Sequence, residues 1–499
     1  MEQKLTRLKN KLNAIYDLKH TAALLEWDQQ VNMPANGNEE RGDQIGTISE
    51  LAHNMFVSED IGQLLSELQT ESSNLDPRSD DASLIKVTQR LYDQETKIPV
   101  ELLKNLAQLT SVAYPYWEKA KESNQFSVFQ PYLEKIIALT RELAQCFQPY
   151  DHIYDPLLNF YEPGMKTADV KQIFDELRPL QVDLIHDIAH HAPIDDSFLR
   201  QYFEPEKQWQ FGLEVAEAFG IDWKRSRQDK SAHPFTTTFG QNDVRFTTKV
   251  LDRHMTSSLF STMHESGHAL YELGFNPAFK RTPLSDASSL AVHESQSRLW
   301  ENLIGRSRAF WHHFYPKLMD LFPDQLHNID VETFYRAINK VEPSLIRTEA
   351  DEATYNLHVM LRLELEMELM EDKLAVKDLP SAWNARMQEY LGVTPSDDTR
   401  GVLQDVHWSA GLIGYFPTYA LGNLISVQLW EKMRVDLHTL DDKISQGDFH
   451  DILQWLRVNV HQHGAKFEPQ ELVQQITGSK IDAKPYIRYL KTKYEEIYR

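Results

Sequence analysis

Apolar residues recur at three- and four-residue intervals along most of the chain, which is the spacing of a helix that turns one face to a core. Between residues 1 and 70 this pattern predicts two packed helices, separated by a break at residues 33–37. The polar run at residues 71–83 predicts a loop. Further helices are predicted at residues 84–90, 100–121, 131–147 (opened by Pro131) and 168–190 (capped by Thr167).

Two stretches carry the shorter spacing that is typical of strands. Threonine and phenylalanine dominate residues 234–239 and 244–248, which flank the turn residues 240–243 and predict a β-hairpin. A second alternating run, LRLELEMEL at residues 361–369, has no β-branched residue and continues a helical stretch from about Leu345. Propensity and length therefore predict one long helix there instead of a strand.

A short motif suggests a metal site. His264, Glu265 and His268 have the HExxH spacing that is used by zinc peptidases. Residues four apart lie on one face of a helix, so both imidazoles can face a single tetrahedral ion. Glu265 follows the first histidine and is placed to act as a base toward water that the metal activates.

The apolar spacing around the motif predicts a helix that Thr256 or Ser257 caps and Gly274 ends. Gly267 lies inside this helix. An internal glycine costs about 1 kcal/mol relative to alanine, so we expect another part of the chain to approach the backbone closely at this point.

A zinc site needs a third protein ligand. The next predicted helix, residues 287–304 with Ser285 or Asp286 as its cap, carries the adjacent pair His293 and Glu294. Neighbours on a helix point about 100° apart, so only one of the two can face the metal. The residues alone leave that choice open; we prefer Glu294, which gives a His/His/Glu set with one negative ligand.

The composition of the chain limits the classes of partner and the cellular compartment that we expect. The net charge is −22 with no long basic tract, which argues against nucleic acid and anionic membranes as partners. Cys146 is the only cysteine, so no intrachain disulfide can form, and neither a signal-like segment nor an 18-residue apolar run occurs. We therefore expect a cytoplasmic protein. Neither internal repeats nor low-complexity linkers mark separate domains along the chain.

Other residues have a functional and a structural interpretation. Arg347 could bind a substrate carboxylate, or it could pair with Asp351 four residues later, which the residues themselves favour. His407 or a tyrosine of the glycine-bearing aromatic stretch that follows it could donate a hydrogen bond to an oxyanion. The predicted hairpin could bind an extended peptide along its edge, or serve only as structure.

Several phrases together resemble the thermostable carboxypeptidase (carboxypeptidase Taq) family. They are DVRFT at 243–247, the HExxH motif with HESQ at 293–296, IRTEAD at 346–351 and GVLQDVHW at 401–408. LEWD at 25–28 and YEPG at 161–164 are similar to that family too, so the resemblance spans nearly the whole chain.

This resemblance implies a mainly α, zincin-like metallopeptidase fold with a deep active-site groove and a small β-sheet beside the metal helix, in a homodimer. It implies one domain over residues 1–499, which we divide into N-terminal helices at about 1–230, a metal-site part at about 231–430 and C-terminal helices at about 431–499. It also implies a metallocarboxypeptidase that removes single C-terminal residues from peptides with broad specificity. One zinc ion per chain, which cobalt can replace, would be its cofactor. The implied site residues are the metal ligands His264, His268 and Glu294, the base Glu265, and the carboxylate-binding Arg245 and Arg347. The mechanism that we predict from these residues also places His407, Tyr415 or Tyr419 at the oxyanion.

Two other functions remain as alternatives. A zinc oligoendopeptidase of similar helical fold would share the HExxH motif and the glutamate ligand but would need no carboxylate anchor. A non-catalytic helical binding protein would use the same histidines as ordinary core or surface groups. An endopeptidase should still cleave a peptide whose C-terminus is amidated, whereas a carboxypeptidase should not. A purified protein that is free of metal and hydrolyses nothing would support the second alternative.

Overall fold

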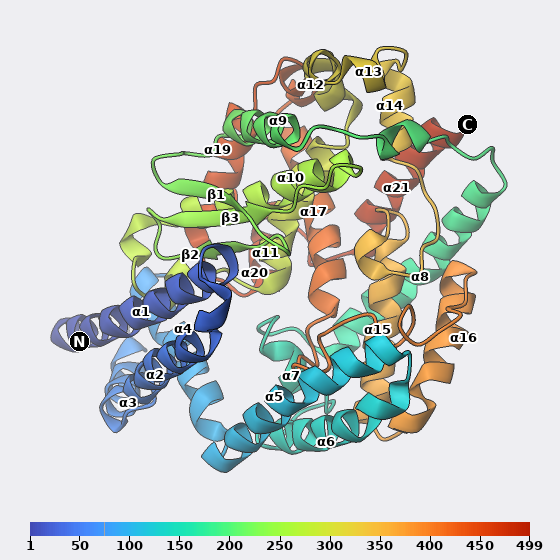
Figure 1. Ribbon diagram of the computed structural model, residues 1–499. Coiled ribbons are helices and arrows are strands. Elements are labelled where there is room, and N and C mark those ends of the chain that lie inside the picture. The colour runs from blue at the N-terminus through green and yellow to red at the C-terminus, as the bar shows by residue number, and fades with distance from the viewer. Residues whose placement is uncertain (74) are drawn as a thin grey trace.

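Helices form most of the computed structural model, which describes residues 1–73 and 75–499 (Figure 1). A single three-stranded sheet accompanies them in this part of the chain. The helices are α1 (Glu2–Val31), α2 (Asn38–Phe56), α3 (Glu59–Ser72), α4 (Asp80–Lys97), α5 (Val100–Ser123), α6 (Phe126–Gln145), α7 (Asp155–Asn159), α8 (Thr167–Ala189), α9 (Pro205–Phe219), α10 (Met255–Leu273), α11 (Leu290–Arg298), α12 (Arg308–Leu321), α13 (Pro323–Leu326), α14 (Val331–Ile338), α15 (Tyr355–Met370), α16 (Leu379–Leu391), α17 (Pro417–Asp436), α18 (Leu440–Ser445), α19 (His450–Asn459), α20 (Pro469–Thr477) and α21 (Ala483–Tyr498).

The N-terminal helices differ in number from the prediction. The break at residues 33–37 is confirmed, but residues 1–70 contain three helices, because α2 ends at Phe56 and α3 starts at Glu59. The connection has neither glycine nor proline, so the apolar pattern runs through it without a visible interruption. The predicted loop at 71–83 is shorter, since Ser79 accepts a hydrogen bond from the Ala82 backbone N–H and caps α4.

The next helices lie where the sequence predicts them, but some of their first residues differ from the prediction. Those predicted at 100–121 and 168–190 are confirmed as α5 and α8. Thr167 is the first residue of α8, not its cap, and its hydroxyl donates to Asp155 at 2.6 Å. Pro131 does not open a helix but lies inside α6. That helix starts at Phe126, whose backbone N–H donates to the carboxylate of Asp398 at 3.0 Å. A cap so distant in sequence cannot be read from the local pattern.

The sheet has the order β1 (Ser226–Lys230), β3 (Val244–Thr248), β2 (Thr236–Thr238). β2 and β3 pair in the antiparallel sense, with Thr237 opposite Arg245, so the predicted hairpin is confirmed. β1 pairs with β3 in the parallel sense and was not predicted, because its sequence SRQDK is charged and has no apolar alternation. β2 is therefore an edge strand, and it lies against α10.

The helix that carries the HExxH motif and the helix that carries Glu294 both begin at other residues than predicted. α10 begins at Met255, so neither Thr256 nor Ser257 caps it, and Gly274 ends it as predicted. α11 begins at Leu290 and not near residue 287, because Ser289 accepts a hydrogen bond from the Val292 N–H. The caps predicted for that helix have other partners: Ser285 accepts a hydrogen bond from Gln241 and Asp286 accepts one from Tyr16.

The run at residues 361–369 is helical as predicted, and it lies within α15. This helix starts at Tyr355 and not at about Leu345, because the carboxylate of Asp351 accepts hydrogen bonds from the backbone N–H groups of Ala353 and Thr354 and fixes the chain before the first turn. Arg347 lies in a separate short turn ahead of the helix.

Two clusters of buried apolar side chains hold these elements. The larger one joins residues from Ile98 to Ile497 and surrounds α10, α11 and α17. The smaller one belongs to α1–α4 and includes Phe279, Leu284 and Ala465 from the rest of the chain. In Figure 1 the blue α1–α4 lie together at one side of the molecule, next to the sheet. None of the helices in the described residues is long and apolar enough to cross a membrane.

Candidate metal centre and substrate cleft

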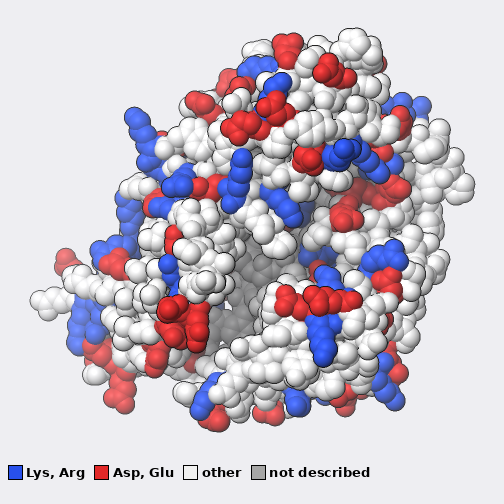
Figure 2. Space-filling view, in the orientation of Figure 1, with Lys and Arg blue, Asp and Glu red and all other residues white. Residues whose placement is uncertain are grey.

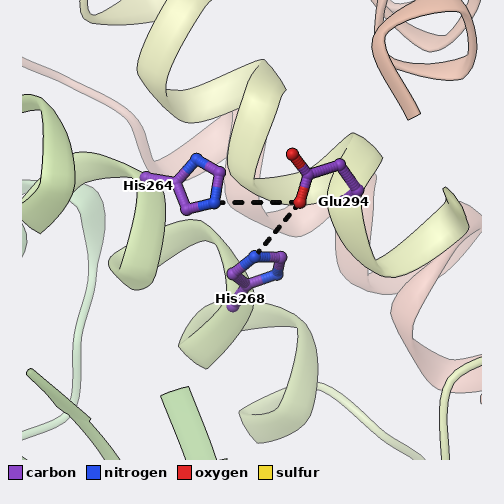
Figure 3. A group of neighbouring side chains, drawn as sticks. All are labelled: His264, His268 and Glu294. Atoms are coloured by element: carbon purple, nitrogen blue, oxygen red, sulfur yellow. Dashed lines mark ion pairs between the residues drawn. The ribbon is translucent and has the colours of Figure 1, made fainter. Parts of the chain in front are cut away.

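Three potential metal ligands converge from two helices (Figure 3). His264 and His268 project from α10, and Glu294 projects from α11. The Glu294 Oε2 atom lies 3.8 Å from His264 Nε2 and 3.6 Å from His268 Nε2. Both distances are longer than a hydrogen bond. They approach the separation of about 3.4 Å between two donors that each lie about 2.05 Å from one tetrahedral ion. Two imidazoles and a carboxylate therefore fit a divalent metal ion.

His293, the alternative third ligand, faces another way. Its Nε2 atom lies 3.0 Å from Glu272 Oε1. Its ring stacks on His268, with the ring centroids 4.2 Å apart. Glu294 is thus the member of the adjacent pair that shares a cluster with the two histidines of the motif.

A second set of charged side chains orients these groups. His264 Nδ1 lies 2.9 Å from Glu301 Oε2, which directs Nε2 toward Glu294. Arg298 donates to Glu294 Oε1 at 2.7 Å and to Glu301 Oε2 at 3.3 Å. Burial raises the pKa of both carboxyls, but Arg298 and His264 together outweigh it, so the pKa of Glu294 falls and that of Glu301 drops to about 2. Both carboxylates remain ionised.

Glu301 was not among the predicted site residues. It lies in the π-helical turn Leu299–Ile304, which continues α11. The spacing Glu294, Arg298, Glu301 places alternating charges on one helix face, and this is the signal by which the sequence could have revealed it.

Gly267 allows α10 and α11 to come together at the candidate metal ligands. A Cβ atom at this position would lie 2.6 Å from both the carbonyl oxygen of Gln296 and the Cα of Ser297. Both atoms belong to the backbone of α11, so they cannot rotate away. The close approach expected from the sequence is confirmed. Gly422 of α17 plays a similar part, because a Cβ there would lie 2.7 Å from the Cβ of Glu294.

We expect Gly267→Ala to lower the free energy of unfolding by about 1–3 kcal/mol, since the extra methyl forces the two helices apart. The same shift should weaken metal binding. Urea denaturation and metal titration measure the two effects. Gly46→Ala is the matched control, because no atom lies within 4 Å of its added Cβ and an alanine should stabilise α2. Equal stability of the two variants would contradict this interpretation of the contact.

Glu265 lies on α10 beside the edge strand β2. Its Oε2 atom accepts a hydrogen bond from the Thr236 hydroxyl at 2.6 Å, and its backbone carbonyl accepts one from the same hydroxyl at 3.1 Å. Burial raises the pKa of the Glu265 carboxyl. One strand of the predicted hairpin therefore orients the residue that the motif offers as a base.

A cleft of about 940 Å³ is lined by His264, one of the three candidate ligands, and Figure 2 shows the molecule hollowed near the centre of this face. His264 and Glu265 line it on one side, and Arg347 and Tyr355 line it on another. Arg347 is 5% exposed, and it donates to Asp405 Oδ1 from Nε at 3.1 Å and from Nη2 at 2.9 Å.

The predicted salt bridge between Arg347 and Asp351 is wrong. Asp351 is occupied as the cap of the turn before α15, and Asp405 takes its place as the partner of Arg347. Asp405 also accepts hydrogen bonds from Arg362. The three side chains carry two positive charges and one negative charge, so this group of side chains has a net positive charge.

Arg245 lies on β3 and is not among the described residues that line this cleft. It forms a paired salt bridge with Asp243, at 2.8 and 2.9 Å. Its guanidinium carbon lies 4.4 Å from the ring centroid of Trp27 and 4.9 Å from that of Phe239. The structure thus brings Arg347, more directly than Arg245, into the space beside the motif.

The aromatic candidates for the oxyanion lie together. His407 Nε2 is 3.2 Å from the Tyr419 hydroxyl, and the ring centroid of Tyr415 is 5.4 Å from each of these two rings. Burial lowers the pKa of His407 to about 4, so this imidazole is neutral at pH 7. Burial, reinforced by the charge of Glu294, raises the pKa of Tyr415 and of Tyr419. Both phenols therefore keep their protons and can donate hydrogen bonds.

Comparisons with known proteins agree with this arrangement. Residues 7–494 match the model of the family described as Carboxypeptidase Taq (M32) metallopeptidase. The chain belongs to this family. It is 40% identical over 491 residues to thermostable carboxypeptidase 1 of Thermus thermophilus, and the match covers 96% of each chain. It is 38% identical to carboxypeptidase 1 of Bacillus subtilis, over 98% of this chain and 97% of the other.

A solved structure of a carboxypeptidase of this family from Deinococcus radiodurans is 40% identical and superimposes with a TM-score of 0.97, over 99% of both chains. The predicted fold, mainly helical with a small sheet beside the HExxH helix, is therefore confirmed. Family membership also establishes a metal-dependent peptide hydrolase of the carboxypeptidase type, for which a divalent ion is required.

Proposed function

We propose that His264, His268 and Glu294 bind one zinc ion, which cobalt can replace, and that the protein releases single C-terminal amino acids from peptides with broad specificity. The observation that supports this best is the shared cleft, since the ligand His264 and the candidate base Glu265 face the same space as Arg347. A site with a metal on one wall and a cationic group on another suits a peptide that ends in a free carboxylate.

A divalent ion in this site supplies a Lewis acid that activates water and polarises the scissile carbonyl. Glu265 acts as the general base. Thr236 holds Oε2 of this carboxylate, which leaves Oε1 to take the proton from the attacking water. The raised pKa of Glu265 helps it to keep that proton until it passes to the nitrogen of the leaving amino acid.

Arg347 binds the C-terminal carboxylate of the substrate. Arg362 offsets the charge of Asp405, so the guanidinium of Arg347 retains its attraction for an anion. Arg245 forms a second cationic group at the sheet. An anchor at a fixed distance from the metal selects the last peptide bond, which is the physical basis of exopeptidase action.

His407, Tyr415 or Tyr419 stabilises the oxyanion that forms when water adds to the carbonyl. Neutral imidazole and protonated phenols donate hydrogen bonds without adding a full charge to the site. The wider proposal also includes a single domain, a homodimer and a cytoplasmic location. The family resemblance suggests the dimer, and the lone Cys146 suggests a reducing compartment.

A digest of one peptide in two forms, with a free and an amidated C-terminus, tests the proposal. We expect zinc- or cobalt-loaded enzyme to shorten only the free form, one residue at a time, as mass spectrometry would show. Chelation of the metal should stop the reaction. Internal fragments from both forms would instead identify an endopeptidase, and no hydrolysis by metal-loaded protein would favour a binding protein.

A further inference from the structure

Tyr355 connects the metal centre to Arg347. It is the first residue of α15, it is 6% exposed, and its side chain lines the cleft. Its backbone N–H donates to the Asp351 carbonyl at 3.0 Å, so the start of the helix fixes where the ring lies. No role for this residue follows from the motif or from the proposed chemistry.

One end of the side chain contacts Arg347. The Arg347 Nη1 atom donates to the Tyr355 hydroxyl at 2.8 Å, and Nε and Nη2 donate to Asp405. A guanidinium has five N–H donors. Three are used by these contacts, and one remains on each Nη atom, which is the number that a carboxylate accepts in a paired contact. Tyr355 therefore fixes the orientation of the guanidinium and still leaves it able to bind an anion.

The ring of Tyr355 supports the other side of the cleft. The guanidinium carbon of Arg298 lies 4.6 Å from the ring centroid, within the range of a cation–π contact. Arg298 in turn holds Glu294 and Glu301. A continuous series of contacts thus runs from the candidate metal ligand Glu294 through Arg298 and Tyr355 to Arg347.

We infer that Tyr355 is a positioning residue that holds Arg347 at a fixed distance from the metal ligands. This inference rests on the proposed function, in which Arg347 binds the substrate carboxylate. Its hydroxyl and its ring act on different partners: the hydroxyl orients Arg347, and the ring supports Arg298. Two substitutions at this single position separate the two effects.

Tyr355→Phe removes the hydroxyl and keeps the ring. We expect the KM for a free-acid peptide to rise about tenfold with kcat changed less than about threefold, because a hydrogen bond to a charged group is lost at the anchor. The affinity for zinc, measured by competition with a chelator, should not change. Tyr355→Leu removes the ring as well, so the zinc affinity should also fall about tenfold.

Tyr315→Phe is the matched control. Tyr315 is buried like Tyr355, and its hydroxyl donates to the Ile329 carbonyl at 2.6 Å outside the cleft. It should share any loss of thermal stability but none of the change in KM. A zinc affinity that is normal in Tyr355→Phe but reduced in Tyr355→Leu identifies the effect of the ring.

Arg347→Gln distinguishes failure of this inference from failure of the proposed function. If Arg347→Gln raises the KM and Tyr355→Phe does not, Tyr355 does not position the anchor. If Arg347→Gln itself leaves the KM unchanged, the proposed anchor is wrong and the inference is overturned with it. Equal zinc affinities of Tyr355→Phe and Tyr355→Leu would overturn the role assigned to the ring.

Discussion

Glu265→Gln should reduce kcat by a factor on the order of 10³ to 10⁴ while the metal stays bound. Glutamine keeps the length of the side chain and can still accept the hydrogen bond from Thr236, but it cannot take a proton from water. Steady-state kinetics on a free-acid peptide, together with metal analysis of the purified variant, measure both parts of this result.

Glu349→Gln is the control for that experiment. Glu349 is an exposed glutamate that lines the same cleft, and it has no part in the proposed chemistry. Its removal changes the charge of the cleft by the same amount, so activity should stay within about threefold of the unmodified protein. Substantial turnover by Glu265→Gln would mean that another group acts as the base.

His264→Ala should lose the metal and, with it, all activity. The three proposed ligands come from α10 and α11, so an ion bound to them would also connect these helices. Ligand binding to the folded state alone stabilises it by about 4 kcal/mol at a thousandfold excess over the dissociation constant. Added zinc should therefore raise the melting temperature of the unmodified protein but not that of His264→Ala.

Two further variants test the third ligand. Glu294→Ala should abolish the zinc-dependent rise in melting temperature. His293→Ala should retain a rise, because the Nε2 atom of His293 faces Glu272 and not the other ligands. The opposite pair of results would show that the ligand set is misassigned.

The sequence predicts those features of the fold and the site that neighbouring residues determine. The spacing of His264 and His268 fixes their common face on any helix, and threonine and phenylalanine at short intervals suffice to specify the hairpin. The helix over residues 361–369 followed from its leucines and glutamates despite their alternation.

Distant contacts account for what was missed. α6 begins early because Asp398 caps it, and β1 forms only because β3 offers it a partner. Arg347 was expected to pair within its own turn, but Asp351 is engaged by backbone N–H groups and Asp405 binds the arginine instead. Such pairings join residues that are far apart in sequence, so no local pattern reveals them.

The separate apolar cluster of α1–α4 has a consequence for hydrogen exchange. Helices with their own core can open without exposing the larger one, so their amides exchange through a partial unfolding that leaves the rest of the chain protected. α10 and α11 belong to the larger cluster and should exchange most slowly. Because Trp27 of α1 stacks on Arg245, each such opening that includes α1 also uncovers one face of this guanidinium to water. Slow fluctuations of the N-terminal helices are thereby coupled to the sheet beside the metal helix.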